Sequence, residues 1–74
     1  MNLADDNLME QLGQLEMALQ SSLRGRVHDL RLVVRDQDIV LQGRARSYYA
    51  KQLAQHEAME AGGFSVLVND IEVF

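Results

Sequence analysis

The sequence predicts an α+β fold, a two-layer α-β-β-α-β sandwich with two helices on one face of a three-stranded mixed sheet. Leucines recur at helical spacing near the N-terminus, and residues 30–45 alternate between apolar and polar side chains on both sides of a short polar break. A second helical pattern is followed by a C-terminal run that alternates again. We expect one domain over residues 1–74, because a chain of this length supports a single core.

The first helix is predicted over about residues 6–23. Its N-cap candidates are Asp5, Asp6 and Asn7, and Gly25 follows as a stop signal. The leucines form the stripe of an amphipathic helix that faces a core. They are Leu8, Leu12, Leu15, Leu19 and Leu23.

A β-hairpin is predicted next, with strands over about residues 29–36 and 39–46. A two-residue loop at Gln37-Asp38 sets a register in which the aliphatic residues of both strands share one face. On the opposite face Arg31 is expected beside Arg44, a like-charge pair that lowers stability unless an anion or an acidic group joins it. The expected partners on the aliphatic face are Val34 with Leu41, Leu32 with Gly43, and Leu30 with Ala45.

A second helix is predicted over about residues 48–61, with Ser47 as its N-cap and two glycines after it. A right-handed crossover through this helix leads to a last strand over about residues 64–73, parallel to the second strand or close to it. The side of the helix that faces the sheet carries mostly small residues, which suits close packing. The residues on this side are Ala50, Leu53, Ala54, Glu57, Ala58 and Ala61.

Two residues are predicted to be structural. Gly43 would face the helices, where a side chain would push a helix away from the sheet. Asn69 is a polar member of the apolar face of the last strand. Its amide is therefore expected to bond to backbone groups at a bulge or a strand crossing.

The charge of the chain argues against nucleic-acid binding, since the formal net charge is −4 at pH 7. All seven cations lie within residues 24–51, which indicates either chance clustering or a local basic patch for an anionic partner. The N-terminus lacks the basic start and apolar run of a signal peptide, and no apolar run reaches the roughly 20 residues that span a bilayer. The sequence as given predicts a cytoplasmic protein, or a periplasmic or envelope-associated one if the chain is an excised fragment.

An enzymatic function is not expected. The chain has no cysteine, and it lacks a glycine-rich phosphate loop and a serine in a nucleophile elbow. His28 stands alone and His56 is far from it in sequence, so no metal-ligand spacing is present. Asp36 and Asp38 are predicted at a hairpin tip in water. We therefore expect no catalytic residue, no metal and no cofactor.

The second face of the sheet carries most of the candidate binding residues, arginines and valines that no other part of the chain is expected to cover. Three interpretations remain open. The face is solvated, or it dimerises so that Arg31 and Arg44 meet Asp70 and Glu72 of a second copy, or it binds an anionic lipid or an acidic partner. The residues predicted on this face are Arg31, Val33, Arg35, Val40, Gln42, Arg44, Val66 and Val68.

The start of the second helix combines cations with tyrosines. Arg46 and Lys51 flank Tyr48 and Tyr49, and tyrosine suits a boundary between an apolar and a wet phase. This segment is a candidate for contact with lipid headgroups. The alternative is that the tyrosines pack on the protein itself.

Several short motifs occur in order between Leu30 and Phe74, and in this order and spacing they resemble the BON domain, a small bacterial module first noticed in osmotically induced and nodulation proteins. One departure is Gln37-Asp38, because family members commonly carry Asp-Gly in the hairpin turn. The motifs are the strand ending in Val34, the acidic turn, Ile39-Val40-Leu41 with Gly43, Ser47 before a helix, Lys51 to Ala54, a glycine before Phe64, and VNDIEV at 68–73.

The resemblance implies an α-β-β-α-β fold and a non-enzymatic role, often described as binding phospholipid or supporting the cell envelope. We therefore expect a non-catalytic binding or interaction module of BON type that acts on a protein partner or by self-association. The alternative is a phospholipid-binding module at an anionic membrane surface. No nucleic-acid partner is expected. The candidate residues for ligand or partner binding are Arg31, Val33, Arg35, Val40, Arg44, Arg46, Tyr48 and Lys51.

Overall fold

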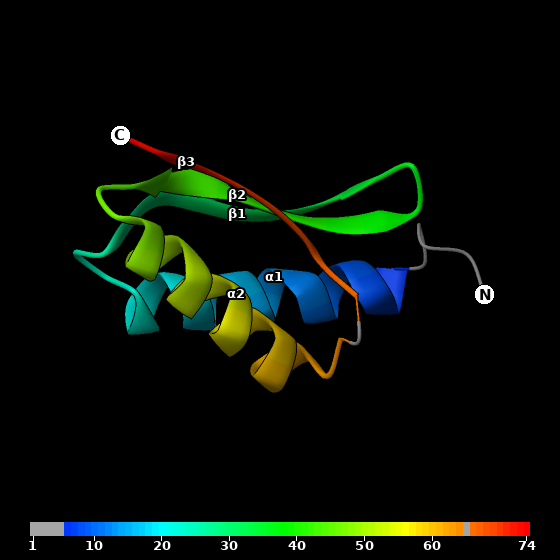
Figure 1. Cartoon of the computed structure of the whole chain (residues 1–74). Coiled ribbons are helices and arrows are strands. Elements are labelled where there is room, and N and C mark those ends of the chain that lie inside the picture. The colour runs from blue at the N-terminus through cyan, green and yellow to red at the C-terminus, as the bar shows by residue number, and fades with distance from the viewer. Residues whose placement is uncertain (1–5, 65) are drawn as a thin grey trace.

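Two helices cover one face of a three-stranded sheet in a computed structural model that describes residues 6–64 and 66–74 (Figure 1). The strand order is β1-β2-β3, with β1 antiparallel and β3 parallel to the central β2. This arrangement is the predicted two-layer α+β sandwich. The elements are α1 (Asp6–Ser22), β1 (Val27–Arg35), β2 (Asp38–Ala45), α2 (Tyr48–Gly62) and β3 (Val68–Val73).

The ends of α2 follow the predicted capping signals. The backbone N–H of Ala50 donates to the hydroxyl oxygen of Ser47, and Gly63 closes the helix in the left-handed conformation with φ 69°. For α1, the N-cap candidate Asp5 lies outside the described residues.

The prediction that the last strand starts at residue 64 is wrong, because β3 begins at Val68. Residue 65 of that predicted strand lies outside the described residues. Phe64 packs beside Gly62 and Leu15 instead of pairing with a strand, since the chain must first return from the far end of α2 to the sheet. The ladder between β2 and β3 then starts at the pair Val40–Val68.

The hairpin turn lies one residue earlier than predicted. Asp36 and Gln37 form it, both with positive φ (53° and 67°), as in a type I′ turn. The twist of this turn matches the twist of the two strands that it joins. Because of this shift Arg35 pairs with Asp38 across the hairpin, where the opposite charges favour the register. The predicted partners Val34–Leu41 and Leu32–Gly43 are therefore wrong. The observed pairs are Val34 with Ile39, Leu32 with Leu41, and Arg31 with Gln42.

A β-bulge separates the two ends of β1. The ladder pairs Val27 with Ala45 and His28 with Arg44, and it resumes at Arg31 with Gln42, so two residues of β1 oppose one residue of β2. In a regular strand, residues three positions apart point to opposite faces of the sheet. The extra residue changes this, so that Val27 and Leu30 are both buried in the core. The predicted pairs Leu30–Ala45 and Arg31–Arg44 are also wrong, because the shifted turn already places Arg31 opposite Gln42, and beyond the bulge Ala45 pairs with Val27.

The core lies between the sheet and the helices. Leu41 of the central strand is fully buried, and Leu23, Leu30 and Ile71 surround it in one cluster. Helix α2 contributes alanines to this cluster, which lets it lie close to the sheet as predicted. The buried alanines are Ala50, Ala54 and Ala58.

Asn69 joins β3 to α2. Its side-chain nitrogen donates to the Lys51 carbonyl oxygen (2.9 Å) and to the Gln55 side chain (3.2 Å), and its side-chain oxygen accepts from the Ile71 N–H (3.1 Å). The amide therefore bonds to backbone groups, as predicted. The place is the contact between β3 and α2, however, and not a bulge or strand crossing.

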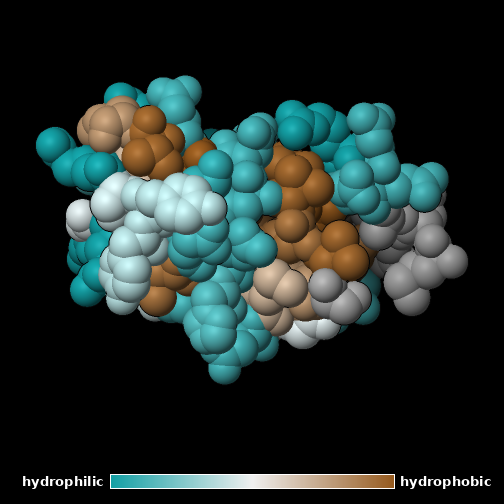
Figure 2. Space-filling view, in the orientation of Figure 1, coloured by the Kyte–Doolittle hydropathy of each residue, from teal (hydrophilic) through white to brown (hydrophobic). Residues whose placement is uncertain are grey.

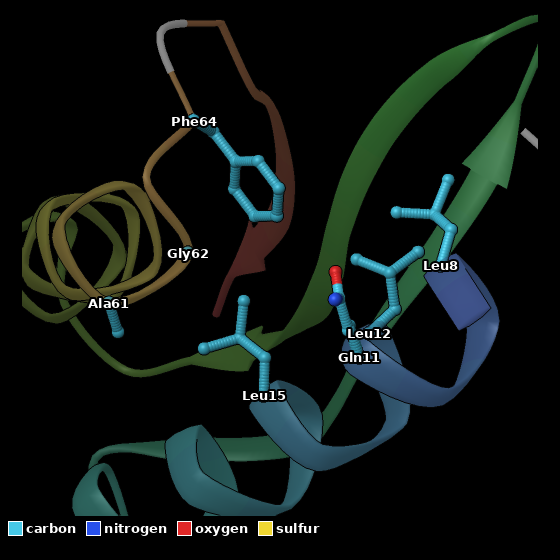
Figure 3. A pocket seen from close by; sticks show the side chains of 7 residues that line it. All are labelled: Leu8, Gln11, Leu12, Leu15, Ala61, Gly62 and Phe64. Atoms are coloured by element: carbon cyan, nitrogen blue, oxygen red, sulfur yellow. The ribbon is translucent and has the colours of Figure 1, made fainter. Parts of the chain in front are cut away.

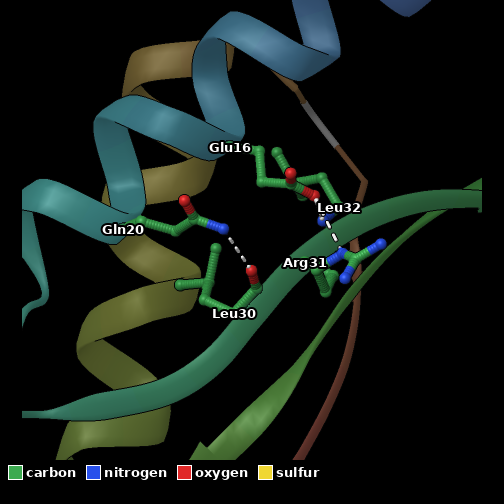
Figure 4. A network of polar contacts seen from close by, with 5 residues as sticks. All are labelled: Glu16, Gln20, Leu30, Arg31 and Leu32. Atoms are coloured by element: carbon green, nitrogen blue, oxygen red, sulfur yellow. Dashed lines mark hydrogen bonds and ion pairs between the residues drawn. The ribbon is translucent and has the colours of Figure 1, made fainter.

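Side chains of α1 close the outer edge of β1 (Figure 4). The side-chain nitrogen of Gln20 donates to the Leu30 carbonyl oxygen (2.8 Å), and the Leu32 N–H donates to the Glu16 carboxylate (2.9 Å). Unpaired edge groups are a template for pairing with another chain. The two bonds therefore occupy the Leu30 and Leu32 positions of this edge and hinder strand addition along the middle of β1.

We expect replacement of both Glu16 and Gln20 by alanine to lower the free energy of unfolding by about 1–3 kcal/mol, because each hydrogen bond contributes about 0.5–1.5 kcal/mol. The opened edge should also increase self-association, measured by light scattering alongside urea unfolding. Gln14→Ala on the exposed part of the same helix is the matched control. Equal urea midpoints and equal scattering for the double variant and the control would contradict this role.

Candidate interaction surfaces

The outer face of the sheet, away from the helices, carries a row of three valines. Val33, Val40 and Val68 lie at one level across β1, β2 and β3. The expectation that nothing covers these valines is wrong for Val40, whose exposed fraction is 1%. Val68 at the sheet edge is exposed.

An ion pair between the two edge strands crosses the central strand at the level of the buried Val40. Arg35 of β1 and Asp70 of β3 approach to 3.5 Å. Arg35 lies beside Asp38 and Asp70 beside Gln42, so the pair crosses β2 at the intervening Val40. The long arginine side chain covers apolar surface while its charged group stays in water.

The arginines predicted to repel one another are separated. Arg31 lies opposite Gln42 and turns toward α1, where its guanidinium is 3.7 Å from the Glu16 carboxylate. Arg44 lies between His28 and Glu72 in the ladder. Each of the two arginines therefore has an acidic neighbour, and the predicted repulsion between Arg31 and Arg44 does not arise.

Arg44 and Arg46 meet instead at the ring of Phe74, which was not among the predicted site residues. The Phe74 ring lies 4.6 Å from the Arg44 guanidinium and 5.3 Å from that of Arg46, and the His28 ring is 6.2 Å away. A cation over an aromatic ring is attracted by the negative electrostatic potential of the ring face. The available signal was the alternation of β3, which continues the outer face through Glu72 to position 74.

The remaining predicted residues lie on the first turn of α2. Tyr48 is exposed, and its hydroxyl accepts a hydrogen bond from the Gln52 side chain (2.7 Å). Lys51 is half-buried. The predicted set is thus divided among the outer face, the cluster at Phe74 and the start of α2.

Exposed hydrophobic residues gather along β3. Four of the eight large hydrophobic side chains that are exposed in residues 6–64 and 66–74 lie on or beside this strand. Figure 2 shows hydrophobic surface over the segment that enters β3 and again at its C-terminal end. The β3 surface is defined here by the hydrophobic Val66, Val68, Val73 and Phe74 together with the acidic Asp70 and Glu72.

A groove of about 240 Å³ lies between the first half of α1 and the end of α2 (Figure 3). Gln11 is its one polar side chain, and it has no charged one, so it offers no group for acid–base or nucleophilic chemistry. The lining residues are Leu8, Gln11, Leu12, Leu15, Ala61, Gly62 and Phe64.

None of the helices that the structure describes is both long enough and apolar enough to cross a bilayer. Comparison of the chain with protein-family models, with curated proteins and with solved structures gave no match. The resemblance to the BON domain stays a prediction.

Proposed function

We propose that the chain is a non-catalytic interaction module of BON type that binds a protein partner through the β3 surface. The observation that carries this proposal is the concentration of exposed hydrophobic side chains along one strand. Exposed apolar patches with a polar surround mark interaction sites on soluble domains. Val66 is the most exposed of them, at 74%.

A partner of different sequence is favoured over a second copy bound through the outer sheet face. The valine row lies at the middle of that face, and the Arg35–Asp70 pair crosses it at Val40, which is buried. A face-to-face dimer would bury this ion pair or break it, and the loss of solvation offsets much of the gain from the valines.

Val66→Asp is expected to abolish partner capture without a loss of stability, because Val66 lies outside the helices and strands. The purified chain is added to an extract of its own cells, cross-linked and recovered with the proteins bound to it. The unchanged chain and the control variant Met17→Asp should recover the same proteins. Met17 is exposed to a similar extent (69%) but lies on α1. Enrichment measured by quantitative mass spectrometry should fall at least about tenfold for Val66→Asp, since an interfacial charge without a counterpart is costly.

Equal enrichment by Val66→Asp and Met17→Asp would contradict the use of the β3 surface. Sedimentation velocity on the purified chain adds a second check. A stable dimer that Val40→Lys dissociates would favour self-association through the outer face.

A second candidate function is binding to an anionic membrane surface, and the cluster at Phe74 favours it. Phe74 is partly exposed with Arg44 and Arg46 on it, and exposed Tyr48 follows in the chain. Aromatic rings next to cations suit the headgroup region of an anionic bilayer.

For this candidate we expect Arg46→Glu to weaken binding to phosphatidylglycerol vesicles at least about tenfold, at about 1 kcal/mol per charge near the surface. Binding should fall as salt rises and be absent on phosphatidylcholine vesicles. Arg24→Glu in the turn after α1 is the matched charge control. Cosedimentation that is equal for both variants would exclude the Phe74 cluster as a lipid site.

A further inference from the structure

The two edges of the sheet differ in how their backbone groups are occupied. At the β1 edge, α1 supplies partners for the Leu30 carbonyl and the Leu32 N–H. At the other edge, no strand lies beyond β3 among the described residues. An unoccupied strand edge is a template for a further strand.

The hydrogen bonds of β3 show which of its residues face that edge. The Phe74 N–H donates to the Ala45 carbonyl oxygen (2.8 Å), so the even-numbered residues direct their backbone groups toward β2. The Ile71 N–H donates to the Asn69 side chain, so the odd-numbered residues direct theirs away from β2. Asn69, Ile71 and Val73 therefore present backbone groups at the open edge.

Asn69 closes only one position of this edge. The Ile71 N–H donates to the side-chain oxygen of Asn69, and this is the one hydrogen bond made by the outward backbone groups of β3 within residues 6–64 and 66–74. The Ile71 carbonyl and both backbone groups of Val73 remain available, and Val73 is exposed at 43%. A residue that offers N–H and C=O together is the unit of strand pairing.

We propose that β3 binds an extended segment of the partner by strand addition. This inference rests on the proposed function and names how the β3 surface is used. Side chains of the added strand would alternate between two surroundings. On the outer face they lie beside Glu72 and Asp70 and are basic, since both carboxylates are exposed at the edge although Asp70 also meets Arg35 at 3.5 Å. On the helix face they lie beside Ile71 and Val73 and are apolar.

The same acids disfavour pairing of β3 with a second copy of itself. Antiparallel pairing of two β3 strands would place Asp70 and Glu72 of both copies on the same face of one continuous sheet. Like charges opposite one another are destabilising. An occupant with alternating lysine or arginine is therefore favoured over another β3.

The probe is a peptide of about seven residues that alternates lysine and valine, the length of an ordinary strand. Methylation of the amide nitrogens along one edge prevents the peptide from growing into an extended sheet, and the like charges of its lysines disfavour pairing of two copies through their free edges. In a ¹H–¹⁵N NMR titration we expect shifts confined to β3 and the first turn of α2. A peptide that alternates glutamate and valine should bind at least about tenfold more weakly, because it meets Asp70 and Glu72 with like charge.

Val73→Pro tests the backbone bond. Proline is tolerated in an edge strand where the N–H points to solvent, so the fold is expected to persist. Affinity for the lysine–valine peptide should fall at least about tenfold, since the paired peptide carbonyl loses its donor. Val73→Thr keeps the N–H and should bind within about twofold of the unchanged chain. Glu72→Lys leaves Asp70 as the one acid of the pair and should reduce the preference for the lysine–valine peptide over the glutamate–valine peptide.

Three outcomes would overturn strand addition: no binding of the lysine–valine peptide, equal binding by Val73→Pro and Val73→Thr, or shifts that map to another surface. These outcomes are separable from failure of the proposed function. Partner capture that Val66→Asp abolishes and Val73→Pro preserves would leave the β3 surface as a binding site and exclude strand addition. If neither variant changes partner capture, both the β3 surface as the binding site and strand addition are excluded.

Discussion

Gly43→Ala is expected to lower the free energy of unfolding by about 3 kcal/mol. Gly43 has φ 156°, a conformation that residues with a Cβ rarely adopt. An added Cβ would lie 3.0 Å from Val27 Cγ1 and 3.1 Å from the His28 carbonyl oxygen, so it would crowd β1, and the prediction that it would push a helix away is wrong. The backbone oxygen cannot move aside without disturbing the bulge in β1, so strain and crowding add to one another.

Gly13→Ala is the matched control for this prediction. Gly13 lies inside α1, where an added Cβ meets nothing within 4 Å. The same chemical change should therefore raise stability by about 1 kcal/mol through helix propensity. Urea unfolding followed by circular dichroism measures both variants. Gly43→Ala within about 0.5 kcal/mol of the unchanged chain would show that this site tolerates a side chain.

Leu41→Ala is expected to lower the free energy of unfolding by about 3–4 kcal/mol. Leu41 is fully buried in the central strand, opposite Leu32 of β1 and beside Asn69 of β3. Strands on both sides hold the surrounding backbone, so the space left by the side chain closes only partly. A domain of 74 residues is typically stable by about 4–10 kcal/mol, so this variant should approach unfolding at 37 °C.

Leu53→Ala removes the same atoms at a half-buried position of α2. It should cost about 1 kcal/mol, because less apolar surface returns to water and alanine favours the helix. Both variants are measured in urea with trimethylamine oxide added, which keeps the weaker one folded. Equal losses for Leu41→Ala and Leu53→Ala would mean that the central strand is not the most tightly packed part of the core.

Much of the fold was available from the sequence because periodicity and capping act locally. The leucines of α1, the alanines of α2 and the Ser47 cap each depend on neighbours within a few residues. The hairpin register was not available in this way. It depends on two positive φ values at Asp36 and Gln37 and on one extra residue in β1, and alternation alone does not reveal a bulge.

The candidate surfaces, like the fold, were only partly predictable from the sequence. The sequence by itself determined the element order, the face that the helices cover and the presence of Arg44 and Arg46 near the end of the sheet. Only the tertiary structure decided that Arg35 and Asp70 pair across β2, that both arginines lie over the Phe74 ring, and that α1 bonds to two backbone groups at the β1 edge while no strand lies beyond β3 among the described residues. The physical reason is that these contacts join separate elements, so they follow from the strand order and register and not from local patterns.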